Sequence, residues 1–180
     1  GGDSIYNGAD DDASGVVAVL EAARALKSGA APKRTLIFVA FTGEEVGGWG
    51  SRYYLAHPVL PLKQTSAQLQ VEMIGRPDSL VLGKGRAWLT GFERSTMGEQ
   101  LRAAGLLVMP DPRPSQRFFS RSDNIAFARA GIPAHTLSSF NLHTHYHRAR
   151  DDVDKVDFEH MTELVRGVVR AIRVLADGPA

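Results

Sequence analysis

Apolar residues along this chain follow two patterns, which alternate along the sequence. One is a short continuous run, and the other is a spacing of three or four residues that places apolar side chains on one face of a helix. The first pattern predicts strands, at residues 35–41, 68–73, 79–82, 87–90 and 132–138. The second predicts helices, at residues 14–29, 47–55, 95–104, 124–130 and 158–175. Because helices alternate with strands, we expect an α/β fold with a mostly parallel, twisted sheet and helices on both faces.

The first and last helices carry the clearest stripes. We expect the first helix to bury a stripe made of Val16, Val19, Leu20, Ala23 and Leu26. The last helix has a longer apolar face, made of Phe158, Met161, Leu164, Val165, Val168, Ile172 and Leu175. Asp157 precedes this helix directly, and we expect its side chain to cap the first turn.

Composition narrows the class of protein. At 180 residues the chain has the length of one domain, and its 43% hydrophobic residues suffice for a core. A formal net charge of +1 provides no basic field for nucleic acid or anionic lipid. No apolar run approaches the roughly 20 residues of a membrane span. The chain has no cysteine, so any metal must be held by carboxylates and imidazoles. Composition leaves the oligomeric state open.

Two adjacent carboxylates, Glu44 and Glu45, follow the predicted buried strand at 35–41. Neighbouring anions near a core repel each other and lose hydration, so their presence needs a reason. A metal ion provides one, because one glutamate can bind the ion while the other accepts a proton from the attacking water. The alternative is an ordinary turn whose acids begin a helix, where the helix dipole favours them.

Further candidate ligands stand near the ends of other elements. Glu72 ends the second predicted strand, His147 lies in the loop after 132–138, and three aspartates at 10–12 precede the first helix. Ligands of such sheets bind beyond the carboxyl ends of the strands, so we expect these groups to converge on one site. A structural alternative exists for each aspartate, since it can simply cap the helix.

The histidines also allow two interpretations. His143, His145 and His147 alternate, so an extended segment would direct all three to one side. Three imidazoles so close together can equally form a surface cluster. We expect His135 to be a strand residue with a local hydrogen-bond partner.

Several segments occur in a characteristic order, namely NGADDDASG at 7–15, FTGEEVGGWGS at 41–51, EMIGR at 72–76, SDN at 122–124 and YHRARD at 146–151. Together they resemble the zinc aminopeptidases of peptidase family M28, and the resemblance covers nearly the whole chain. It implies a site for two zinc ions. Asp11 would bridge the ions, Glu45 and His147 would complete one of them, and Glu72 would bind the other.

The same resemblance implies roles for the neighbouring groups. Glu44 would be the general base that takes a proton from the attacking water and returns it to the leaving amine. Tyr146 would donate a hydrogen bond to the developing oxyanion, with packing behind His147 as the alternative. Asp151 would orient His147, with helix capping near Asp152 as the alternative.

Three departures from the family pattern matter. Glu72 stands where the family often has Asp, which keeps the charge and adds one methylene. Arg148 and Ala149 occupy the places of a Thr-Pro pair. The family also has a ligand histidine in a His-x-Asp segment upstream of the bridging aspartate, and residues 1–3 lack it. We therefore expect residues 1–180 to form a single peptidase catalytic domain that is incomplete at its N-terminus, without the first strands and one ligand.

The resemblance implies hydrolysis of N-terminal peptide bonds, with the N-terminus of a peptide or protein as substrate, and it favours a secreted or periplasmic location. Two other functions remain open. A glutaminyl cyclase-like acyltransferase would need a single zinc ion, which Asp11, Glu45 and His147 could hold. A catalytically inactive relative would act as a binding or structural domain. Substrate preference would depend on loops such as 110–121.

Overall fold

The computed structural model describes residues 4–178. Within this range the α-helices are α1 (Gly15–Lys27), α2 (Trp49–Ala56), α3 (Met97–Ala103), α4 (Asn124–Arg129) and α5 (Phe158–Asp177). The strands in the same range are β1 (Gln68–Val71), β2 (Ala87–Leu89), β3 (Val108–Pro110) and β4 (Ala134–Ser138). No helix of this part of the chain is long and apolar enough to cross a membrane.

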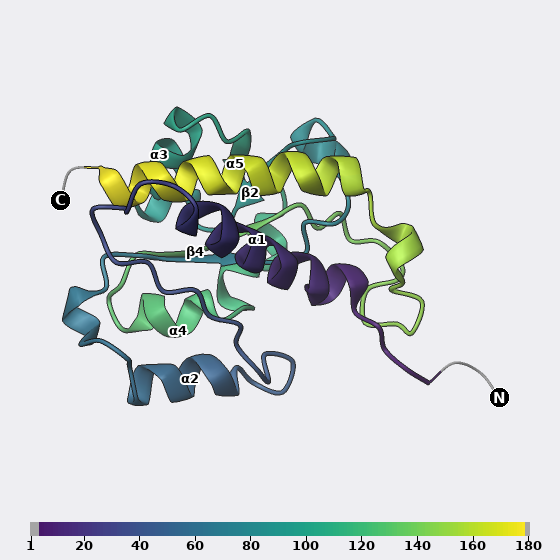
Figure 1. Ribbon diagram of the computed structural model, residues 1–180. Coiled ribbons are helices and arrows are strands. Elements are labelled where there is room, and N and C mark those ends of the chain that lie inside the picture. The colour runs from purple at the N-terminus through teal and green to yellow at the C-terminus, as the bar shows by residue number, and fades with distance from the viewer. Residues whose placement is uncertain (1–3, 179–180) are drawn as a thin grey trace.

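The strands form a mixed sheet in the order β1-β4-β2-β3. β1 and β4 are parallel, with Gln68 opposite Ala134 and Val71 opposite Leu137. β2 and β3 are also parallel, and antiparallel pairing of β2 with β4 joins the two pairs. Helices α1, α3 and α5 cover one face of the sheet, whereas α2 and α4 cover the other (Figure 1). The expected mostly parallel α/β fold is therefore confirmed.

The main core lies between the sheet and the layer of α1, α3 and α5. Leu137 of β4, Leu89 of β2 and Leu164 of α5 are fully buried there. Removing such side chains from water is the main favourable term in folding. The last helix begins as expected, because the carboxylate of Asp157 accepts a hydrogen bond from His160 N–H at 3.1 Å. This packing fixes the carboxyl ends of β1 and β4, where the candidate ligands lie.

The predicted buried strand at 35–41 is wrong. This segment is an irregular connection between α1 and α2, and Ile37 and Phe38 are 42% and 38% exposed. Only its end is anchored, since the Phe41 ring lies 6.0 Å from that of Tyr54 and 5.9 Å from that of Phe127. A strand must pair its backbone groups with a neighbour, and no strand among residues 4–178 pairs with this segment.

Two short elements also differ from the sequence-based expectation. The predicted strand at 79–82 is a 3₁₀ turn, Ser79–Val81, because the Asp78 carboxylate accepts a hydrogen bond from Leu80 N–H at 3.0 Å and caps it. Strand β3 was not expected, because three residues before a proline-rich loop are too few to show a period.

The buried face of α1 matches the predicted apolar stripe only in part, because Leu26 is buried as predicted but other members of the stripe are exposed. Val16 and Leu20 are 40% and 62% exposed, whereas the buried positions are Gly15, Ala18, Ala22 and Leu26. The small residues let the helix approach the sheet closely, and a side chain at Gly15 would collide with the backbone oxygen of Val71. Close approach at the small residues, together with burial of Leu26, therefore determines the buried face.

Candidate metal centre and active-site cavity

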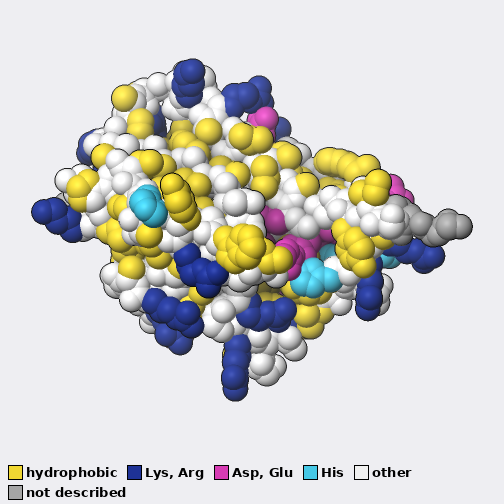
Figure 2. All heavy atoms as spheres, turned by 90° about the horizontal axis from the view of Figure 1, so that it is seen from below, with side chains coloured by type: hydrophobic (Ala, Val, Ile, Leu, Met, Phe, Trp, Pro, Cys, Tyr) yellow, Lys and Arg dark blue, Asp and Glu magenta, His cyan; other side chains and the backbone are white. Residues whose placement is uncertain are grey.

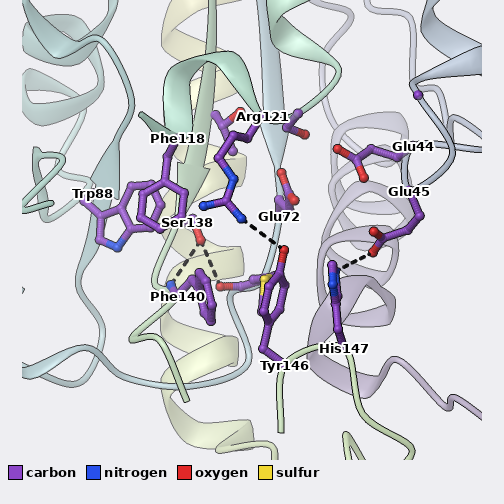
Figure 3. Close-up of a pocket in the computed structure, with 14 residues that line it drawn as sticks. Glu44, Glu45, Glu72, Trp88, Phe118, Arg121, Ser138, Phe140, Tyr146 and His147 are labelled. Carbon is purple, nitrogen blue, oxygen red and sulfur yellow. Dashed lines mark hydrogen bonds and ion pairs between the residues drawn. The ribbon is translucent and has the colours of Figure 1, made fainter. Parts of the chain in front are cut away.

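A cavity of about 310 Å³ lies at the carboxyl ends of β1 and β4. Glu72, which directly follows β1, and Ser138, which ends β4, both line it. One wall, the acidic wall, carries Glu44, Glu45, Glu72 and His147. The opposite wall, the aromatic wall, is formed by Trp88, Phe118 and Phe140 (Figure 3). On the surface, acidic side chains lie next to a histidine in a hollow of the molecule (Figure 2).

Three of the predicted ligands meet at the acidic wall. His147 Nε2 lies 3.1 Å from Glu45 Oε1 and 3.2 Å from Asp11 Oδ2. One donor atom from each of these residues lies within 4.8 Å of the other two. Zinc accepts carboxylate and imidazole ligands, and catalytic zinc sites use three protein ligands and keep a position open. The donor set therefore fits a zinc ion.

A tight turn presents Glu44 and Glu45 to the cavity. Gly47 N–H donates to the backbone oxygen of Glu44 at 3.0 Å, and Gly48 N–H donates to that of Gly43 at 2.9 Å. Gly43 and Gly48 have φ angles of 67° and 65°, which glycine adopts without the steric cost of a Cβ atom. The sequence allowed either a turn or a metal site at Glu44 and Glu45. The turn is present, and it directs both glutamates to the acidic wall.

His147 lies in a compact turn after β4. Tyr146 N–H donates to the backbone oxygen of His143 at 3.3 Å, which closes the turn. The segment is therefore not extended, and the condition under which the three alternating histidines would face one side is not met. His143 Nε2 reaches the carboxylate of Asp10 at 2.9 Å, whereas His147 reaches the carboxylates of the cavity.

The acidic wall is costly to ionise in the absence of a cation. Burial raises the pKa of Glu72 to about 8. Burial and the neighbouring charge of Glu45 raise the pKa of Glu44 to about 7 and that of Asp11 to about 6. A positive charge close to such carboxylates favours their ionised form and reverses these shifts. The electrostatics of this wall therefore favour a bound cation.

The three consecutive aspartates have different partners. Asp11 belongs to the cluster with the imidazole. The carboxylate of Asp12 accepts a hydrogen bond from Gly15 N–H, at the start of α1, at 3.1 Å. Asp10 is buried, and its carboxylate accepts a hydrogen bond from Gly75 N–H at 2.8 Å. The two roles considered for the aspartates thus belong to different residues, because Asp12 caps the helix and Asp11 joins the cluster.

Tyr146 packs against the imidazole and also reaches the cavity. Its ring stacks on that of His147, with centroids 3.8 Å apart. Its hydroxyl accepts a hydrogen bond from Arg121 Nη2 at 3.5 Å (Figure 3). Burial, followed by the charge of Asp11, raises the pKa of Tyr146 to about 12. The hydroxyl therefore keeps its proton at neutral pH and can donate it in a hydrogen bond.

The hydrogen bonds of Asp151 do not go to His147. Its Oδ2 atom accepts from the backbone N–H groups of Asp10 and Asp11, at 3.0 and 2.9 Å. Its Oδ1 atom accepts from Arg76 Nη2 at 3.2 Å. Asp151 thus supports the turn that carries Asp11, and not the imidazole it was expected to orient.

The wall opposite the carboxylates is aromatic. Trp88 of β2 stacks on Phe118 with ring centroids 5.2 Å apart, and Phe140 packs edge-on against Phe118 at 5.8 Å. The guanidinium of Arg121 lies 5.0 Å from the Phe118 ring and extends between the two walls (Figure 3). Two of these residues come from the region of the predicted specificity loop, 110–121. Trp88 and Phe140 carry no sequence signal that distinguishes a cavity wall from ordinary core.

A family model for peptidase family M28 matches residues 2–172. The chain belongs to peptidase family M28. The match includes every segment that contributes to the cavity, and relatives in this family include zinc aminopeptidases.

Three relatives of this M28 chain illustrate the likeness. A probable leucine aminopeptidase 1 of Trichophyton verrucosum (strain HKI 0517) is 28% identical over 183 residues, which cover 94% of this chain and 48% of the relative. The zinc aminopeptidase BSAP of Bacillus subtilis is similar with a TM-score of 0.78 and 23% identity, over 96% of this chain and 43% of BSAP. Glutaminyl cyclase of Porphyromonas gingivalis shares the fold with a TM-score of 0.63 and 18% identity, over 93% and 63% of the two chains. This M28 chain spans about half the length, or less, of the curated relatives it matches.

The predicted site residues of this M28 chain fall into two groups. The first group has donor atoms at mutual ligand distance and comprises Asp11, Glu45 and His147. The second group lines the same cavity outside that cluster and comprises Glu44, Glu72 and Tyr146.

Proposed function

We propose that the intact protein hydrolyses N-terminal peptide bonds in a zinc-dependent reaction. The observation that supports this proposal is that the side chains of Asp11, Glu45 and His147 meet at one point. Glu44 lines the neighbouring cavity and is not part of that cluster. Membership of peptidase family M28 implies a peptide substrate and supports the choice of zinc.

Two sets of residues would hold the metal. Asp11, Glu45 and His147 would bind one zinc ion, and Asp11 together with Glu72 would contribute to a second. Bound zinc supplies Lewis-acid chemistry, since it lowers the pKa of water from about 16 to about 7 and polarises a carbonyl group.

Glu44 would move the proton. Its carboxylate stands beside Glu45 at the cavity and is free to accept a proton from the attacking water. A base with a pKa near the working pH can also return that proton, here to the leaving amine. The pKa of Glu44 is about 7 in the metal-free site, and bound zinc would lower it, which would keep the carboxylate ionised and able to accept the proton.

Tyr146 and the aromatic wall would act on the rest of the substrate. The protonated hydroxyl of Tyr146 would donate a hydrogen bond to the carbonyl oxygen as negative charge develops there. Trp88, Phe118 and Phe140 would contact the side chain of the N-terminal residue and favour an apolar one.

The test of this proposal is Glu44→Gln in the intact protein. We expect zinc content to stay at the wild-type level and hydrolysis of an aminoacyl-anilide to fall by about 10²–10⁴-fold, the usual contribution of a general base. Glu93→Gln is the matched control, because Glu93 is exposed and pairs with Arg94. Zinc retention together with near-normal hydrolysis would show that Glu44 is not the base.

A second function is supported by the number of ligands that meet. Asp11, Glu45 and His147 suffice for one zinc ion, which is the set that a glutaminyl cyclase-like acyltransferase would need. One zinc per intact chain, with release of ammonia from an N-terminal glutaminyl peptide, would favour this reaction. Two zinc ions and hydrolysis of anilides would favour the aminopeptidase. A folded protein without zinc affinity would favour an inactive binding relative.

A further inference from the structure

Asp151 contacts three successive residues of the turn that carries Asp11. Its backbone oxygen accepts a hydrogen bond from Ala9 N–H at 2.9 Å, and its carboxylate accepts from the N–H groups of Asp10 and Asp11. We propose that Asp151 is a positioning residue, which sets the place of Asp11 at the metal centre relative to His147. This inference rests on the proposed role of Asp11 as a zinc ligand.

The contacts of Asp151 restrain the backbone from which the Asp11 side chain projects. Asp11 has φ −108° and ψ 91°, outside the helical region, although it lies inside a helical turn. Asp11 is the third residue of this turn, so its N–H has no partner within the turn, and Asp151 Oδ2 accepts that N–H at 2.9 Å. A hydrogen bond to an ionised carboxylate is roughly twice as strong as one between neutral groups. Asp151 thereby supports a conformation that a helix alone would not give.

The position of Asp151 in the chain connects two ligand-bearing segments. Asp151 stands four residues after His147, in the loop that follows β4. Its side chain is only 2% exposed, so water competes little for its hydrogen bonds. One buried carboxylate therefore joins the turn of Asp11 to the loop of His147, whose side chains meet at 3.2 Å.

Arg76 extends the same restraint to the segment that follows Glu72. Its Nη2 atom donates to Asp151 Oδ1 at 3.2 Å, and its Nε atom lies 3.7 Å from Asp10 Oδ2. The other oxygen of the Asp10 carboxylate accepts from Gly75 N–H at 2.8 Å. The guanidinium offsets the charge of two buried carboxylates, which would otherwise repel each other. Three segments that carry proposed zinc ligands thus meet at one buried network.

The experiment compares zinc binding by the intact wild-type protein and Asp151→Asn. Asparagine keeps one acceptor oxygen but places an amide NH₂ group against either the turn N–H groups or Arg76. We expect the Kd for zinc, measured by competition with a chromophoric chelator, to rise by about 10–100-fold, as is typical for loss of a group that supports a ligand. We also expect the visible absorption of the cobalt-substituted protein to change, since cobalt bands report ligand geometry.

Two further variants separate positioning from folding. Asp154→Asn is the matched control, because Asp154 lies in the same region of the chain, is exposed and pairs with Lys155. Its zinc Kd and cobalt spectrum should equal those of the wild type. Asp151→Glu keeps the negative charge, so it tests the role of Asp151 if Asp151→Asn does not fold. We expect Asp151→Glu to shift the cobalt spectrum and to raise the Kd for zinc less than Asp151→Asn does. Urea unfolding of each metal-free variant measures the purely structural effect.

The outcomes distinguish this inference from the proposed function. A lower free energy of unfolding with unchanged zinc Kd and cobalt spectrum, in both Asp151 variants, would reduce Asp151 to a structural role and overturn the inference. The proposed function would survive that result, provided that Asp11→Asn weakens zinc binding. Wild-type zinc affinity in Asp11→Asn, or no zinc affinity in the wild type, would overturn both.

Discussion

The two walls of the cavity are built on opposite physical principles. The aromatic wall is held by contacts that improve when water leaves, such as the stacking of Trp88 on Phe118. The acidic wall gathers groups that lose hydration and repel each other, and the pKa of Glu72 accordingly rises to about 8. The aromatic wall is therefore stable by itself, whereas the acidic wall needs a cation to become stable in its ionised form.

This difference indicates how each wall is assembled. The aromatic wall forms part of a hydrophobic cluster with Met73 and Val81, so the same packing that folds the chain also shapes it. The acidic wall depends on hydrogen bonds that buried carboxylates, such as those of Asp10 and Asp151, accept from backbone N–H groups. Substitutions in the acidic wall should consequently change metal binding, whereas substitutions in the aromatic wall should change substrate preference.

The largest effect is expected from His147→Ala. This change removes the only imidazole from the cluster, so the Kd for zinc should rise by more than the 10–100-fold typical of supporting residues. Chelator competition measures the Kd. His145→Ala, in the same turn, is the matched control and should bind zinc as the wild type does. Similar zinc affinities in the two variants would show that His147 is not a ligand.

A smaller effect is expected from pH in the metal-free protein. The folded-state pKa of Glu72, Glu44 and Asp11 is raised, so the folded state binds more protons than the unfolded state. The free energy of unfolding should therefore fall as pH rises from about 5 to about 8, by about 1–2 kcal/mol after allowance for solvent in the open cavity. Urea unfolding in the presence of a chelator measures this slope.

The matched variants for the pH experiment are Glu72→Gln and Glu99→Gln. The first removes the group with the highest pKa of the three and should flatten the slope, whereas the second changes an exposed residue paired with Arg102 and should not. Saturating zinc should reverse the trend, because metal binding requires deprotonated ligands. Metal-free stability that increases between pH 5 and 8 would contradict the assignment of these shifts.

Much of the fold follows from hydrophobic patterns, and the failures have specific causes. Strand β4 is confirmed and is buried along its whole length, and helix α5 is confirmed with Met161, Leu164 and Val168 of its predicted apolar face buried, although Phe158 is 60% exposed. The segment at 35–41 is equally apolar, but hydrophobicity does not say whether a neighbouring strand is present to pair with it. The buried face of α1 depends on close approach at Gly15 and Ala18, and side chains too small to appear in a hydrophobic stripe allow it.

The candidate site shows the same division. The order of the acidic and histidine segments is sufficient to propose Asp11, Glu45 and His147, because sheet topology brings the ends of strands together. The contacts of Asp151 could not be predicted, since a side chain bonded to distant backbone N–H groups leaves no pattern in the sequence. Trp88 could not be assigned to a cavity wall either, because an aromatic residue in a strand has the same appearance in a core.

The smallest effect is expected from Phe118→Leu in the aromatic wall. Leucine keeps an apolar side chain but loses the stacking with Trp88, an interaction of about 0.5–1.5 kcal/mol beyond buried area. KM for aminoacyl-anilides with large apolar side chains should rise by a few fold, whereas kcat and zinc affinity should change little. Phe158→Leu is the matched control, because Phe158 is exposed on α5. If Phe118→Leu instead lowers zinc affinity as much as His147→Ala does, the two walls are not independent, and the division of metal binding and substrate preference between them is wrong.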